Sequence, residues 1–249
     1  MVFGLLGTAF GVALATPRLH AVLFDIDGTL FNSDALHLRA FQDLLEEIGF
    51  DGGKRISERF FMERISGRQN AAIVRDLFPE KSEAEGAKFS AQKEARFREL
   101  AATELSALVT PGLEELLSWL AERGVRCAAV TNAPRENAEL MLGAIGRLGW
   151  FNPLIIGDEC SAGKPSPEPY LRAMSELGVP PEECIAFEDS PSGARAAVAA
   201  GVRTIGITST QTAEALVQQA GCVRAVADFT DADLRHELEQ RVPQIRTDK

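Results

Sequence analysis

The chain has 249 residues, of which 45% are hydrophobic and 25% charged, and its formal net charge is −10. The length and apolar content support one large domain, or a core with a smaller inserted domain, and exclude a disordered chain. The negative charge argues against nucleic-acid binding, which depends on clustered Lys and Arg, but it permits a small anionic substrate where a local cation receives it.

The first 18 residues, MVFGLLGTAFGVALATPR, form an apolar segment that contains Ala13-Leu14-Ala15, a pattern suited to a signal peptidase. No basic residue precedes the apolar run, and the run is too short to span a bilayer. We therefore expect residues 1–19 to be a short amphipathic extension packed on a cytoplasmic protein that makes no membrane contact. Organelle import or secretion through this segment is the alternative.

The stretch AVLFDIDGT predicts a buried strand at residues 21–24 followed by a turn. Because a strand repeats every two residues, Asp25 and Asp27 can point the same way. Two carboxylates this close repel one another unless a cation, a shared proton or water relieves them, and a solvated acidic turn is the simplest alternative. A calcium loop is excluded, because its glycine and glutamate positions hold Leu30 and Leu36.

The next part of the chain has only helical patterns, and no strand pattern interrupts it. Helices are predicted at residues 35–50, 57–65, 68–78 and around 91–100. From Thr110 the pattern changes to an alternation of helices and strands. Helices are predicted at 111–124, 134–146, 167–178 and 192–201, and strands at 125–132, 153–158, 184–189 and 202–208.

This alternation indicates an α/β fold with a Rossmann-like parallel sheet covered by helices on both faces. The first strand precedes the helical block and the other strands follow it. We therefore expect an all-helical cap at residues 34–106, inserted into a core formed by residues 20–33 and 107–249. Cys127, Cys160, Cys184 and Cys222 lie far apart without a C-x-x-C pair, so four reduced thiols are expected.

Ligands of open parallel sheets bind beyond the carboxyl ends of the strands. The residues at these ends are Asp25, Asp27, Thr131, Asn132, Asp158, Glu188 and Asp189. Their acidic oxygens suit Mg²⁺, and Lys164 in GKPSPEPY adds a compact positive charge, so together they predict a receptor for phosphate. Taken singly, each has a structural explanation, such as a strand-end hydroxyl, a solvated lysine or an acidic pair at a helix N-terminus. A P-loop is excluded, because Pro165 follows the lysine.

The ordered set of motifs resembles the haloacid dehalogenase superfamily of phosphohydrolases. FDIDGT is similar to its first motif, Thr131 in VTNA to the second, Lys164 in GKPSPEPY to the third and FEDSPSG to the fourth. The stretches SDALHLRAF, ISGRQNAAI and AVTNAPRENAELM look most like the sugar-phosphate phosphatases of the superfamily. These form one subgroup with the β-phosphoglucomutase-like enzymes. The resemblance implies a Mg²⁺-dependent phosphatase of small phosphorylated metabolites, such as sugar or polyol phosphates.

By this resemblance, Asp25 is the nucleophile that forms an aspartyl phosphate, which divides one hydrolysis into two displacements. Asp27 protonates the leaving oxygen and then accepts a proton from water. Lys164, Thr131 and Asn132 hold the phosphoryl oxygens. The implied ligands of Mg²⁺ are Asp25, the backbone carbonyl of Asp27, and Asp189, with Glu188 as a ligand or close neighbour.

Specificity is expected from the cap. His37 is close enough to Asp27 to face the cleft, and Arg68 has donors suited to sugar hydroxyls or a second phosphate. A packed histidine and a solvated arginine are the alternatives. The nearest alternative function is a phosphosugar mutase. The alternative outside the enzymes is a non-catalytic protein that keeps this fold. A dehalogenase is disfavoured by the presence of Asp27. A monomer or weak dimer is expected.

Overall fold

The computed structural model describes residues 17–242 and places six parallel strands in one sheet, in the order β3-β2-β1-β4-β5-β6. The strands are β1 (Ala21–Phe24), β2 (Arg126–Thr131), β3 (Leu154–Ile156), β4 (Cys184–Glu188), β5 (Arg203–Ile207) and β6 (Arg224–Val226). β1 lies between β2 and β4, and Phe24 is in register with Ala129 and Phe187. The predicted parallel sheet is confirmed, and its central strand ends at the paired aspartates.

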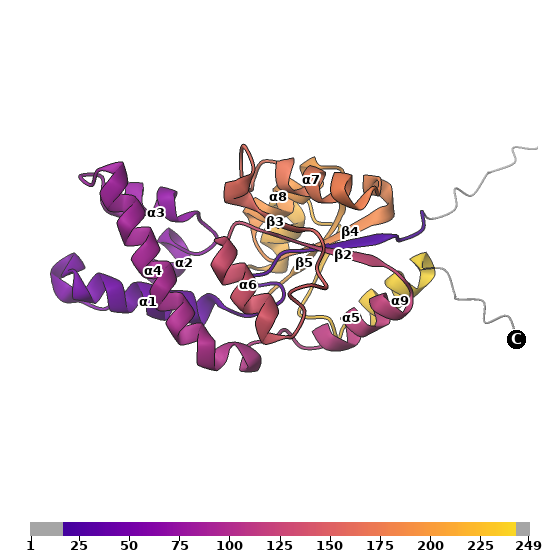
Figure 1. The fold of residues 1–249 in the computed structure, drawn as a ribbon, viewed down its shortest axis with the longest axis horizontal. Coiled ribbons are helices and arrows are strands. Elements are labelled where there is room, and N and C mark those ends of the chain that lie inside the picture. The colour runs from indigo at the N-terminus through magenta and orange to yellow at the C-terminus, as the bar shows by residue number, and fades with distance from the viewer. Residues whose placement is uncertain (1–16, 243–249) are drawn as a thin grey trace, which may run out of the picture.

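Helices cover both faces of this sheet (Figure 1). They are α5 (Leu113–Glu122), α6 (Arg135–Ala144) and α9 (Ala232–Arg241) on one face, and α7 (Glu168–Leu177) and α8 (Pro191–Ala199) on the other. Alternate side chains of β1 serve the two faces: Val22 and Phe24 pack in one core, and Ala21 and Leu23 in the other. Strands buried on both faces need continuous apolar runs, which explains why short stretches such as AVLF form them.

Four helices follow β1 and gather at one end of the molecule, away from the sheet (Figure 1). They are α1 (Asp34–Glu47), α2 (Glu58–Arg64), α3 (Asn70–Leu77) and α4 (Glu83–Glu104). They share an apolar core of their own, formed by Phe41, Leu44, Leu45, Ile56, Phe61, Ile65, Ile73, Val74, Phe78 and Phe89. The predicted helical insertion is therefore present, and we keep residues 34–106 as the proposed bounds of the cap.

Two helices differ from their predicted bounds. α1 ends at Glu47, before the predicted residue 50, because Gly49 adopts a left-handed conformation with φ of 71°. α4 begins at Glu83, well before the predicted stretch around 91–100. A capping box starts it there: the Ser82 side chain accepts from the Glu85 N–H, and the Glu85 carboxylate accepts from the Ser82 N–H.

Two elements near the end of the described chain were not predicted. β6 has three residues, of which only Val226 is buried. α9 is mostly polar and buries only Leu234, Leu238 and Arg241, so the sequence has no clear apolar stripe there. Both elements are held by the neighbours they pack against rather than by a strong local pattern.

The remaining expectations concern the cysteines and the N-terminal segment. All four cysteines are free, as predicted. The predicted packing of the extension falls on residues 1–16, which lie outside the described part of the chain, although Leu19 is buried. Within residues 17–242, no helix has the length and apolar character that crossing a membrane requires.

Candidate active site

A cleft of about 150 Å³ lies between the carboxyl ends of the strands and the helical cap. The core side is lined by Asp25, Asp27, Thr131, Asn132, Lys164 and Asp189, and the cap side includes Asp34, His37, Ser66, Arg68, Asn70, Lys93 and Glu94. Glu188 is fully buried and meets Lys164 at the back of this site. Asp158, the remaining strand-end acid, is exposed and does not line the cleft. The structure thus brings all the other predicted residues to one place.

Lys164 is the central cation on the core side. Its Nζ donates to Asp25 Oδ1, Glu188 Oε1 and the carbonyl oxygen of Val130, each at 2.6 Å, which uses all three ammonium protons. The side chain is only 4% exposed. Burial acts to lower the pKa of Lys164, but Asp25 and Glu188 outweigh it and hold the pKa above its ordinary value. The lysine therefore stays charged and fixes two carboxylates at the ends of β1 and β4.

Asp25, Glu188 and Asp189 form a cluster of buried carboxylates whose oxygens lie within 4.8 Å of one another. Burial raises the pKa of Asp25 to about 8, and Glu188 adds to the shift while Lys164 opposes it. Burial also raises the pKa of Asp189 well above its ordinary value, with further contributions from Asp25 and Glu188. The single positive charge of Lys164 cannot balance three ionised carboxylates. The hard oxygen donors and the missing positive charge fit Mg²⁺.

Two glycines make room for the acidic cluster. Gly28 has a φ of +76°, and a Cβ at this position would lie 2.0 Å from Asp189 Oδ2. A Cβ on Gly193 would lie 1.9 Å from Glu188 Oε1. Thr210 Oγ1 donates to Asp189 Oδ2 at 2.5 Å and holds that carboxylate in place. The Asp-Gly-Thr turn is thus required by close packing as well as by backbone conformation.

Asp27 has a separate set of partners on the cap side. Its Oδ1 accepts from Ser33 Oγ at 2.7 Å and from His37 Nε2 at 2.9 Å. Lys93 Nζ lies 2.9 Å from His37 Nδ1. Because an ammonium group can only donate, Nδ1 accepts this proton and Nε2 carries the hydrogen that Asp27 receives. Burial acts to raise the pKa of Asp27, but the bonds from His37 and Ser33 hold it below its ordinary value.

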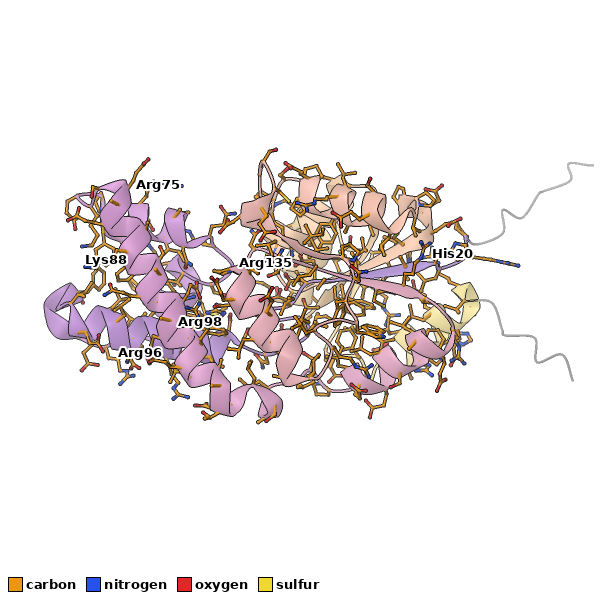
Figure 2. All side chains as sticks on the ribbon, in the orientation of Figure 1. His20, Arg75, Lys88, Arg96, Arg98 and Arg135 are labelled. Atoms are coloured by element: carbon orange, nitrogen blue, oxygen red, sulfur yellow. The ribbon has the colours of Figure 1, made fainter. Side chains whose placement is uncertain are left out.

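Lys93 also joins a buried polar network with Glu94 on α4. Glu94 Oε1 accepts from Lys93 Nζ at 2.9 Å and Asn70 Nδ2 at 2.5 Å, and Glu94 Oε2 accepts from Asn137 Nδ2 at 2.6 Å. Arg98, labelled in Figure 2, donates from α4 to Asn137 Oδ1 on α6 at 2.9 Å. This network links the cap to the core. It was not predicted, because its charged residues, Lys93, Glu94 and Arg98, lie in a stretch of alternating charges that is typical of a solvated helix.

Thr131 and Asn132 follow β2 as expected. Thr131 Oγ1 accepts from the Ala133 N–H at 2.9 Å, which leaves its hydroxyl hydrogen available to a ligand. The Asn132 amide binds the backbone of Lys164 at both ends, accepting from its N–H at 3.0 Å and donating to its carbonyl at 3.1 Å. Asn132 therefore holds the lysine loop in this structure, and its direct contact with phosphate stays a prediction.

Arg68 lines the cleft, but its guanidinium is bound within the cap. Its Nη1 donates to Asp76 Oδ2 at 2.9 Å and to the carbonyl oxygen of Arg64 at 2.7 Å. Arg64 also donates to Asp76, so this carboxylate is shared by two arginines. The predicted contact of Arg68 with a sugar would have to compete with Asp76.

Asp25 and Asp27 are two residues apart in the chain, but their side chains have different surroundings. Asp25 faces a lysine and further acidic oxygens, whereas Asp27 faces a hydroxyl and an imidazole. The first environment suits a nucleophile beside a metal ion, and the second suits a group that exchanges protons with a bound ligand. Such a pair can carry out phosphoryl transfer, because different surroundings give the two carboxylates different protonation behaviour.

Comparisons with known proteins agree with this geometry. Residues 19–201 match the family model of the haloacid dehalogenase-like hydrolases. Over 235 residues, the chain is 32% identical to Protein CbbY of Rhodobacter capsulatus, covering 92% of this chain and 99% of that one. It is 35% identical to the validoxylamine A 7'-phosphate phosphatase of Streptomyces hygroscopicus subsp. limoneus over 79% of this chain and 89% of the relative. A crystal structure of a CbbY variant from Rhodobacter sphaeroides with xylulose-(1,5)bisphosphate matches with a TM-score of 0.75 and 29% identity, covering 86% and 96% of the two chains.

The buried carboxylates predict how pH and metal affect stability. The pKa of Asp25 is raised from 3.8 to about 8, so at intermediate pH the folded protein keeps a proton that the unfolded chain has released. Without metal, this contribution to stability is present below about pH 4 and is lost as pH rises toward 8. Mg²⁺ should raise Tm more at pH 8 than at pH 5, because protons compete for its ligands. Thermal unfolding with Mg²⁺ or EDTA measures this, and an equal or larger shift at pH 5 contradicts it.

Gly28→Ala tests the packing of the turn against Asp189. Gly124→Ala is the matched control, because Gly124 has a φ of +66° and a Cβ at that position would meet no atom within 4 Å. Both substitutions should lower stability by about 1–2 kcal/mol through the left-handed backbone. Only Gly28→Ala should also remove most of the rise in Tm with Mg²⁺, since it displaces Asp189. A full Mg²⁺ response in Gly28→Ala would show that Asp189 does not bind the metal.

Proposed function

Because the chain belongs to the haloacid dehalogenase-like hydrolases, we propose that it hydrolyses phosphate monoesters of small polyhydroxylated metabolites through an aspartyl phosphate on Asp25. Its identification as a phosphoric monoester hydrolase agrees with the named phosphatase among its relatives. The observation that carries the mechanism is the pair of carboxylates at the end of β1, with Asp25 bonded to Lys164 and Asp27 bonded to Ser33 and His37.

In the first half-reaction, a carboxylate oxygen of Asp25 attacks phosphorus and the bond to the leaving oxygen breaks. Asp27 gives a proton to that oxygen, so the product leaves as a neutral alcohol. Asp27 is ionised in the free site, and the bound phosphate dianion would raise its pKa so that it carries this proton. Its position beside His37, whose Nε2–H faces its Oδ1, orients the carboxyl group for this transfer. We assign the phosphoryl oxygens to Thr131 and Lys164, where Lys164 would exchange one of its three present acceptors for phosphate, and both would stabilise the charge that develops.

In the second half-reaction, Asp27 takes a proton from water, and the resulting hydroxide attacks the phosphorus of the aspartyl phosphate. Asp25 is restored as a carboxylate, inorganic phosphate leaves, and Asp27 is protonated again. We assign Mg²⁺ to Asp25, Asp189 and the backbone carbonyl of Asp27, with Glu188 beside them. Bound there, it would offset the repulsion between the carboxylates and the phosphate dianion.

The names of the relatives do not agree on whether the substrate carries one phosphate or two. One is named as a phosphatase of validoxylamine A 7'-phosphate, whereas the similar CbbY structure contains xylulose-(1,5)bisphosphate. A panel of phosphorylated metabolites assayed with Mg²⁺ tests the proposed function. Release of inorganic phosphate supports it. Formation of an isomerised sugar phosphate would favour the mutase instead, and no reaction with any ester would favour a non-catalytic role.

Asp25→Asn should reduce turnover by at least ~10³-fold, because it removes the nucleophile and keeps its shape. Asp158→Asn is the matched control: Asp158 is an exposed acid after β3 of the same sheet, outside the cleft, and its change should leave turnover within about twofold. Beryllium fluoride with Mg²⁺ should raise the Tm of the native protein and not of Asp25→Asn. Retention of more than about a tenth of the activity in Asp25→Asn would refute the covalent mechanism.

Lys93→Met tests the link from the cap to Asp27. Without Lys93, the His37 Nδ1 loses its donor, and the imidazole is no longer held in the tautomer that bonds Asp27. Turnover of sugar phosphates should fall by about 10-fold or more, and turnover of p-nitrophenyl phosphate by less than about threefold, because its leaving group needs no proton. Lys88→Met is the control, since Lys88 is on the same helix and exposed to solvent (Figure 2). Equal losses on both substrates would exclude this role for Lys93.

A further inference from the structure

Charged side chains lie on both sides of the cleft. Lys164 lies on the core side, where the transferred phosphate would bind. Hydroxyl and amide groups come from Ser66, Gln69 and Asn70 of the cap and from Asn137 of α6, and the cap-side cations are Arg68 and Lys93. Two carboxylates, Asp34 and Glu94, lie among them. The cap side therefore offers many hydrogen bonds, and its two cations share it with two carboxylates.

The positive charges on the cap side already have acidic partners. Among the described residues that line the cleft, only Arg68, Lys93 and Lys164 are lysine or arginine. Lys93 is bonded to Glu94 Oε1, and Arg68 to Asp76 Oδ2, each at 2.9 Å. A second phosphate bound under the cap would meet no cation without a carboxylate beside it. It would also lie near Glu94 and Asp34, which repel an anion.

Glu94 has the geometry of a hydroxyl acceptor. The residue is only 6% exposed, yet it lines the cleft. Two donors, Asn70 and Lys93, occupy Oε1, whereas Asn137 alone donates to Oε2. A carboxylate oxygen accepts two hydrogen bonds, so Oε2 has one acceptor position left. Burial acts to raise the pKa of Glu94, but Lys93 keeps it below the ordinary value, and the ionised group accepts without donating.

We propose that Glu94, positioned by Asn70 and Asn137, is a specificity-determining residue that accepts a hydroxyl of the leaving group and disfavours a second phosphate. The preferred substrate is then a monophosphate of an uncharged polyhydroxylated compound, and bisphosphates are poor substrates. A hydroxyl can donate to Oε2, whereas a phosphate dianion offers only acceptors and negative charge. This inference rests on the proposed phosphatase function and adds the class of its leaving group.

The experiment compares kcat/KM for matched pairs of esters, glucose 6-phosphate with glucose 1,6-bisphosphate and fructose 6-phosphate with fructose 1,6-bisphosphate. In the native protein, each monophosphate should be preferred by about 10-fold or more, because like charges placed together under the cap cost affinity. Turnover of p-nitrophenyl phosphate is measured in parallel, since it reports the chemistry at Asp25 without a sugar.

Two variants make the cap side of the cleft less negative or more positive, one at Glu94 and one at the partner of Arg68. Glu94→Gln removes the negative charge and should raise the ratio of bisphosphate to monophosphate kcat/KM by about 10-fold. Asp76→Asn weakens the hold on Arg68 without touching the cleft, and should raise the same ratio by about threefold to fivefold. Glu63→Gln is the matched control: Glu63 pairs with Arg59 on the exposed surface of α2, and the ratio should not change.

The outcomes separate this inference from the proposed function. A native protein that hydrolyses p-nitrophenyl phosphate and takes each bisphosphate at least as well as its monophosphate overturns the inference and leaves the phosphatase function standing. An unchanged ratio in both Glu94→Gln and Asp76→Asn also overturns it, because neither charge would then reach the substrate. Absence of turnover with every ester, p-nitrophenyl phosphate included, overturns both.

Discussion

The buried ammonium of Lys164 is the interaction on which the rest of the site depends. It binds Asp25 and Glu188 at the ends of adjacent strands, β1 and β4, in a region too buried for water to screen their repulsion. Other residues hold this lysine and its partner Glu188 in position. Asn132 holds its backbone, and the Tyr170 hydroxyl donates to the same oxygen of Glu188 at 2.7 Å. A charged site can persist in this core because Lys164 donates to two of its carboxylates, and the remaining negative charge suits a divalent cation.

The cap reaches the reacting groups through Asp27. His37 on α1 connects this aspartate to Lys93 on α4, and its ring stacks on Phe97, with 4.1 Å between the ring centroids. Asp27, to which we assign proton transfer, is therefore oriented by His37 of the cap together with Ser33, whereas Asp25, the proposed nucleophile, is held by core side chains. On the proposed mechanism, this division would give Asp25 a stable environment for Mg²⁺ and would let Asp27 respond to the bound substrate and to the position of the cap.

The cap lysine connects proton transfer to substrate choice. Lys93 donates to both His37 and Glu94, so one cation supports the group beside Asp27 and the carboxylate proposed to bind a hydroxyl. Glu94 also meets Asn137 of the core, which ties the cap to α6. A substrate that bonds to Glu94 would strengthen contacts across the cleft, because the cap and the core both position this carboxylate. Binding energy from the sugar could thereby be used for closure over the phosphate.

The sequence alone determined the sheet and the core side of the site, because those features are local. Apolar runs mark the strands, and Asp25, Asp27 and Lys164 lie in short motifs at their ends. On the cap side, the sequence predicted that His37 and Arg68 face the cleft, but their partners and the buried network were decided only by tertiary structure. The sequence around Lys93 and Glu94 has the charge pattern of a solvated helix, and packing of α4 against α1 and α6 is what buries these residues. Sequence spacing carries no information on which charges pair across helices, since pairing depends on helix packing and burial.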